Sequence, residues 1–130
     1  IEDMAPVLHH KGTFFDLSYH DSHAELSRWN IDHATQIVSP GLNGKDYDDT
    51  IAFIAAIDKV ATVTTTVAHV CGALGRKASV LVPEVAQWRY AYHVNEGREM
   101  LWYPSDSVRL YRQKHGETWE PAIKRLAADL

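Results

Sequence analysis

The stretch VTTTVAHVCGALG, from Val63 to Gly75, decides how this chain folds because its apolar period changes partway along it. The residues that lead into it, Lys59–Val63, form a short run rich in β-branched side chains, which is typical of a buried parallel strand. Beyond the three threonines, the apolar residues fall on one helix face at the spacing i, i+3, i+4 and i+7: Val67, Val70, Cys71 and Leu74. Gly75 follows Leu74, and a glycine at this position favours the end of that helix. The sequence therefore predicts a strand that runs directly into a helix.

Hydroxyl side chains crowd the junction between this strand and this helix, at Thr64–Thr66. Thr65 or Thr66 can cap the helix, and the N–H groups of its first turn have no partner within the helix. The positive end of the helix dipole also lies there. A junction of this kind is suited to binding a phosphate.

Composition predicts one globular domain over residues 1–130. The chain has 130 residues, of which 45% are hydrophobic, and this length is too short for two ordinary domains. A net charge of −4 and the absence of a Lys/Arg-rich run argue against nucleic acid or an anionic membrane as partner. No apolar run approaches the roughly 20 residues of a membrane span, so we expect a cytoplasmic protein. Cys71 is the only cysteine, and its place on the apolar helix face favours core packing over nucleophilic chemistry.

Strands and helices are predicted to alternate along the chain. Apolar runs predict strands at 13–18, 34–38, 59–63, 78–82 and 108–111, and helices at 24–29, 50–57, 67–74 and from 119 to the end. Expected helix caps are Asp21 or Ser22, the acidic pair Asp48 and Asp49, and Thr118. Strands separated by helices indicate right-handed crossovers. We therefore predict an α/β, three-layer Rossmann-like domain with a mostly parallel sheet of about five strands.

Ligands of such domains bind at the carboxyl ends of the strands. The candidate binding surface therefore consists of four loops: 18–22, 39–49, 64–66 and 83–107.

Several motifs in order carry a resemblance to a known family. They are DKVATVTTTVAHVCGALG at 58–75, ASVLVP at 78–83, WRY at 88–90, WYPS at 102–105 and VRLYRQ at 108–113. This succession resembles the C-terminal half of bacterial heptosyltransferase-like glycosyltransferases, as found at the end of tetratricopeptide-repeat proteins. The similarity runs over most of the chain, from about Gly12 to Leu130. The resemblance implies a GT-B architecture whose C-terminal half binds a nucleotide sugar, so this chain is expected to be that half of a longer protein.

The resemblance also implies roles for the residues at the junction. Thr65, Thr66 and His69 match the family segment that lies beside the pyrophosphate and sugar of the donor. Hydroxyls, N–H groups and an imidazole can bind phosphates without a metal, and we expect no metal and no cofactor. His69 is alternatively a buried structural histidine, although the resemblance favours ligand contact. The family usually has an aspartate where this chain has Thr64, which affects catalysis more than binding.

Other loops contribute further candidates. Tyr19, just beyond the first strand, can reach a base or sugar. Asp49 matches an acidic helix start, where it either faces the ligand or caps the helix, and capping is favoured. Arg89 can pair with a phosphate. Trp88 or Trp102 can stack on a ring, although for Trp102 a covering role at the sheet edge is favoured.

A metal site is a further alternative in the polar loop that contains His20, Asp21 and His23. The spacing is irregular and matches no metal-binding motif, so solvated loop histidines are favoured over metal ligands.

Three functions are consistent with these residues. We expect the donor-binding half of a glycosyltransferase, inactive alone because the resemblance places the general base and the acceptor site mainly in the N-terminal half. Its partners would be a nucleotide sugar and either that missing half or a second copy bound at the cleft face. A degenerate, non-catalytic binding or interaction module is the alternative, which Thr64 favours. A receiver-type domain ranks last, because Asp16 is the only acidic residue of its strand.

Overall fold

The computed structural model describes residues 1–42, 46–90, 93–94, 99–103 and 106–130, and it confirms the α/β class. The larger sheet is built around three parallel strands, β3 (Val60–Val63), β4 (Ala78–Val82) and β7 (Val108–Arg112). Two short strands extend it in antiparallel orientation, β6 (Glu99–Met100) and β5 (His93–Val94), so that the order is β3-β4-β7-β6-β5. β4 is buried at four of its five positions and β7 at three of five, as expected of strands covered on both faces.

Helices cover the parallel strands on both faces, as predicted. Helix α4 (Thr66–Ala73) and helix α3 (Tyr47–Ala56) share one apolar cluster with Val80 and Val82 of β4. Helices α5 (Glu120–Ala128) and α1 (Ala5–Leu8) pack on the other face, against Leu81 and Tyr111. Because Val80, Leu81 and Val82 are consecutive, their side chains alternate between the two faces of the sheet. The three-layer arrangement around these strands is therefore present.

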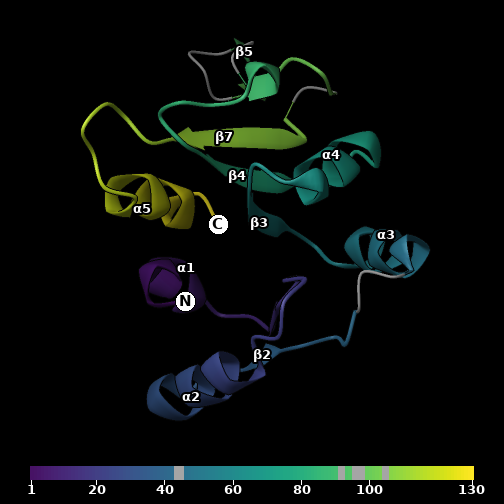
Figure 1. Ribbon diagram of the computed structural model, residues 1–130, viewed down its shortest axis with the longest axis vertical. Helices are drawn as coiled ribbons and strands as arrows, with labels where there is room; N and C mark the ends of the chain where they lie inside the picture. Colours follow the sequence, from purple (N-terminus) through teal and green to yellow (C-terminus); the bar gives the residue numbers. More distant parts are fainter. Residues whose placement is uncertain (43–45, 91–92, 95–98, 104–105) are drawn as a thin grey trace.

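The prediction of a mostly parallel sheet of about five strands is confirmed only in part, because three strands of the larger sheet are parallel and two of the expected strands lie outside it. The strands expected at 13–18 and 34–38 are β1 (Phe14–Phe15) and β2 (Ile37–Val38), which pair with each other and form a separate two-stranded parallel sheet. Helix α2 (His23–His33) connects them, and together they occupy the lower part of the view in Figure 1. Among the described strands, β1 pairs only with β2.

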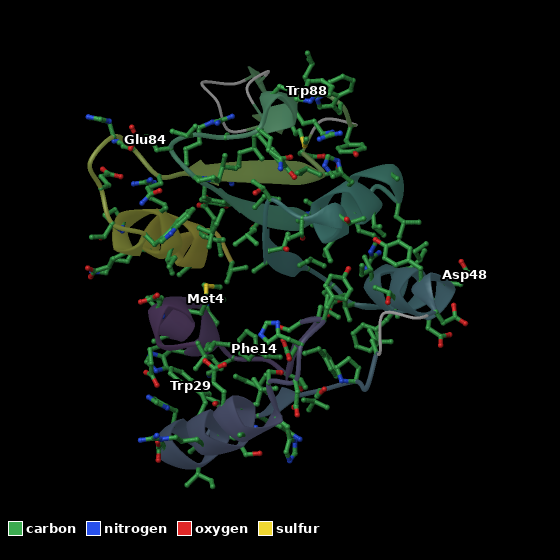
Figure 2. All side chains as sticks on the ribbon, in the orientation of Figure 1. Met4, Phe14, Trp29, Asp48, Glu84 and Trp88 are labelled. Atoms are coloured by element: carbon green, nitrogen blue, oxygen red, sulfur yellow. The ribbon has the colours of Figure 1, made fainter. Side chains whose placement is uncertain are left out.

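Side chains, rather than main-chain hydrogen bonds, connect the two sheets. Phe14 contacts both the cluster around α5 and the cluster of α2, and Figure 2 shows it between the two parts of the molecule. Phe15 packs edge to face on Phe53 of α3, with ring centres 5.2 Å apart. β1 therefore lies between the same helical layers that cover β3, although it is not hydrogen-bonded to it.

The boundaries of α4 agree with the sequence pattern. Val67 and Cys71 are buried, Val70 is half-buried, and burial raises the pKa of the Cys71 thiol to about 11. Gly75 ends the helix with a φ of +65°, a value that favours glycine. Leu74 differs from the prediction, because it is 42% exposed.

The predicted caps are mostly wrong. Ser22 precedes α2, but its hydroxyl donates to Asp16 and not to the helix, whereas the carboxylate of Asp21 accepts from the His23 N–H at 3.0 Å. α3 begins one turn early and is capped by Asp46 instead of Asp48 or Asp49. α5 begins at Glu120, which places Trp119 rather than Thr118 at the cap position.

Three short elements of the aromatic loop were not predicted: the 3-10 turn η2 (Trp88–Tyr90) and the strands β5 and β6. At the start of the chain, a 3-10 turn, η1 (Glu2–Met4), precedes α1. Parts of the candidate loops 39–49 and 83–107, including Pro104 and Ser105 of the WYPS motif, lie outside the described residues. Within the ranges that the structure describes, none of the helices combines the length and the apolar character that crossing a bilayer requires.

Candidate functional site

The start of α4 forms directly at the carboxyl end of β3, as the change of period predicts. Thr65 occupies the cap position in an extended conformation, but its side chain makes no capping hydrogen bond. Its hydroxyl instead lies 3.2 Å from the hydroxyl of Thr62, and its N–H donates to the carbonyl of Val63 at 2.7 Å. Thr64 is half-buried, and Thr66 begins the helix and is exposed. The Thr65 hydroxyl is therefore directed to Thr62 rather than to the helix end, and Thr66 is the exposed member of Thr64–Thr66.

A cavity of about 730 Å³ opens between β1 and β3. Thr62, Val63 and Thr65 line it on one side, and a continuous segment from Thr13 to His20 lines it on the other. Its walls are mainly apolar, with polar groups at the carboxyl ends of the two strands. Pockets of roughly 300–1,000 Å³ are usual for small ligands. The cavity brings together two predicted site residues that are far apart in the sequence, Thr65 and Tyr19.

Asp16 holds the β1 side of this cavity in place. Its Oδ1 accepts from the N–H of Ser18 at 3.0 Å and from the Ser18 hydroxyl at 2.6 Å, and its Oδ2 accepts from the hydroxyl of Ser22. Partial burial opposes ionisation of Asp16, but the hydrogen bonds from Ser18 and Ser22 outweigh it and lower the pKa. Such an Asp-centred turn orders the loop that carries Tyr19.

Tyr19 itself is 55% exposed, and its hydroxyl end lies beside Tyr47 of α3. Burial, and then the neighbouring Tyr19, raise the pKa of the Tyr47 phenol. Tyr19 thus lines the cavity while more than half of the residue is exposed.

His69 lies one turn into α4 and does not line the cavity. Its Nδ1 is 2.7 Å from the hydroxyl of Tyr103, and its Nε2 is 3.4 Å from the hydroxyl of Tyr90. Tyr103 also rests on Gly72, where a Cβ atom would come within 2.3 Å of its ring. Burial, and then the positive charge of Arg89, lower the pKa of His69. The imidazole is therefore held between two tyrosines and favoured in its neutral form.

Arg89 lies in η2 and is exposed. Its guanidinium lies 5.0 Å from the ring centre of Trp88, and its carbonyl accepts from the indole N–H of Trp102 at 3.0 Å. Tyr90, which follows Arg89 in η2, contacts His69, so Arg89 and His69 lie on the same side of the domain. Tyr103 packs on Gly72 of α4, and Trp102 is 53% exposed.

Asp49 lies apart from both the cavity and the residues around His69. It lies exposed in the first turn of α3 and does not line the cavity. Its neighbour Thr50 is buried, and its hydroxyl has no hydrogen-bond partner among the described residues. For the polar loop, the described part of the chain contains no group of three or more His, Cys, Asp or Glu side chains arranged to hold a metal.

Sequence reasoning missed the two features that organise the site. The tyrosine pair around His69 depends on a contact between α4 and a loop more than 30 positions later, as the separation of 34 residues between His69 and Tyr103 shows. Gly72 was the available signal, since a glycine inside a helix marks close approach of another group. Asp16 was noted only as an isolated acidic residue, although Ser18 and Ser22 nearby are typical partners for a strand-end aspartate.

Comparison with known proteins identifies no relative of this chain. No family model, no curated protein and no solved structure matches this chain.

Proposed function

We propose that this chain is the nucleotide-sugar-binding half of a heptosyltransferase-like glycosyltransferase. The pyrophosphate of the donor binds at Thr64–Thr66, where the first turn of α4 supplies N–H groups and hydroxyls. The nucleoside extends toward Tyr19 at the mouth of the cavity. His69, on the other side of the α4 start, faces the sugar.

One observation carries this proposal: Thr65 and Tyr19 line the same cavity of about 730 Å³, and each follows the carboxyl end of its strand, β3 or β1. Ligands of open α/β sheets bind at such strand ends. The exposed hydroxyl of Thr66 and the positive end of the helix dipole supply the interactions that an anion needs. The sequence resemblance favours the same residues.

The proposal assigns binding, not turnover, to the isolated chain. Transfer to an acceptor hydroxyl needs a general base within hydrogen-bond reach of that hydroxyl. Thr64 replaces the acidic residue of the resembling family, and His69 is already engaged by Tyr90 and Tyr103. We therefore expect donor binding without transfer, and transfer only together with an N-terminal half.

The test compares nucleotide affinity by calorimetry in two variants. Thr65→Ala combined with Thr66→Ala removes two hydroxyls but keeps the main-chain donors, and we expect binding to weaken by about 1–2 kcal/mol. Asp49→Asn is the matched control, because Asp49, like Thr66, is exposed in the first turn of a helix, but that helix is α3 and not α4. Equal affinity of the double variant and the natural chain would contradict the proposed position of the phosphates.

A non-catalytic binding or interaction module is the second candidate. The engagement of both ring nitrogens of His69 favours it, since a histidine held by Tyr90 and Tyr103 serves structure. An assay of sugar transfer with the N-terminal half supplied separately distinguishes the two candidates. Transfer supports the enzyme, whereas nucleotide binding with no transfer in any combination supports the module.

A further inference from the structure

Two tryptophans present their rings to solvent on one surface of the molecule. Trp88 is 58% exposed and Trp102 is 53% exposed, and their ring centres lie 5.6 Å apart with an interplanar angle of 79°. Figure 2 places Trp88 at the outer surface, at the end of the molecule opposite Trp29. Trp29, by contrast, is fully buried. Exposed indoles that lie in contact form an apolar surface that a globular chain rarely leaves uncovered without use.

Neighbouring groups fix this pair in place. The indole N–H of Trp102 donates to the carbonyl of Arg89, and the Arg89 guanidinium stacks on the ring of Trp88. Tyr103, the next residue after Trp102, is anchored to His69 and Gly72 of α4. The rings are thus ordered before any ligand arrives, which lowers the entropy cost of binding. We call Trp88, Arg89 and Trp102 the indole platform.

The chemistry of the indole platform defines its ligand. Two indoles at nearly a right angle offer one ring face beside one ring edge, and the negative face of an aromatic ring attracts the weakly positive C–H groups of a pyranose. The Arg89 guanidinium adds N–H donors at the rim for hydroxyl oxygens. We propose that the indole platform binds a neutral pyranose ring of a glycan. None of its three residues lines the cavity beside Thr65, so this site is separate from the proposed nucleotide site.

The test is an NMR and fluorescence titration of the whole chain with cellohexaose, chitohexaose and maltohexaose. We expect at least one of these glycans to shift the indole N–H signals of Trp88 and Trp102. Trp88→Ala should weaken that binding roughly tenfold or more, the effect of removing one stacking ring, and Trp88→Phe should restore part of it. Val85→Ala is the control, because Val85 is 89% exposed and lies outside the platform.

Three results would overturn the proposal. The first is the absence of any indole shift with all three glycans. The second is a shift produced by uridine or adenosine while the glycans stay silent, which would assign the platform to a base. The third is a dimer in sedimentation that Trp88→Ala dissociates while the glycans stay silent, which would assign it to a protein interface. Because Trp88 is exposed and its variants leave the core intact, each result can be obtained on folded protein, as circular dichroism will verify.

Discussion

At the scale of single residues, the contacts of His69 indicate that this residue has a structural role in the free protein. The imidazole accepts or donates at both nitrogens toward tyrosine hydroxyls, and burial disfavours its charged form. A neutral histidine can still donate one hydrogen bond to a sugar oxygen, but only by giving up a tyrosine partner. His69 therefore positions the Tyr90 and Tyr103 loop in the free protein.

The pKa of His69 is the first prediction. Burial, and then Arg89, hold it below the usual value of 6.5, so we expect NMR titration to show a neutral ring at pH 7. Arg89→Gln should raise this pKa without restoring the usual value, because burial is the larger cause. Lys124→Gln, a change at an exposed residue of α5, is the control.

The lowered pKa of His69 determines how this residue affects the stability of the fold as the pH changes. Its pKa is lower in the folded chain than in the unfolded chain, so the unfolded chain binds more protons as the pH falls through 6.5. The contribution of His69 to stability is therefore complete above pH 6.5 and decreases below it. A His69 pKa at or above 6.5 would contradict the account.

At the scale of elements, α4 could be predicted closely while its contacts could not. The apolar period and Gly75 define the helix from local sequence alone. Caps were less predictable, because a hydroxyl such as that of Ser22 can satisfy a distant carboxylate instead of the helix end. The packing of α4 against the aromatic loop depends on Tyr103, and no local pattern indicates that contact.

The close contact between Gly72 and the Tyr103 ring can be tested by substitution. Alanine inside a helix normally stabilises it, but here a methyl group would enter the space of the Tyr103 ring. We expect Gly72→Ala to destabilise the fold by about 1–3 kcal/mol in urea unfolding.

The control is a double-mutant cycle with Tyr103→Ala, in which the penalty of the Gly72 substitution should disappear. Equal or greater stability of Gly72→Ala in the presence of Tyr103 would show that the ring does not rest on α4.

At the scale of the whole molecule, the sequence predicted the five strands at 13–18, 34–38, 59–63, 78–82 and 108–111, but not their division between two sheets. Strand positions follow from local apolar runs, whereas sheet membership depends on pairing between distant segments. Gly12 precedes β1 and Asp16 turns the chain after it, so β1 is a strand of only two residues. Of the candidate site, the sequence predicted Thr64–Thr66, which are adjacent in the chain. It did not predict the cavity that Tyr19 also lines.

Amide hydrogen exchange tests whether β1 and β3 belong to separate sheets. The N–H groups of Phe14 and Asp16 donate to β2 and its preceding residue, and that of Val60 donates to the chain just before β4. Successive N–H groups of a strand point to opposite sides, so those of Phe15 and Ala61 face away from these partners. We expect Phe15 and Ala61 to exchange faster than Phe14 and Val60. Equal protection at all four would mean that β1 pairs with β3 in one continuous sheet.

The central claim is that a nucleotide sugar binds where β3 meets α4 and extends to the end of β1. The most direct measurement is a two-dimensional NMR titration of the chain with UDP, GDP, ADP and CMP and one sugar conjugate of each. The account predicts that one nucleotide shifts the signals of Thr65, Thr66 and Tyr19 together, which would also identify the base. Shifts confined to other surfaces, or none with any member of the panel, would contradict it.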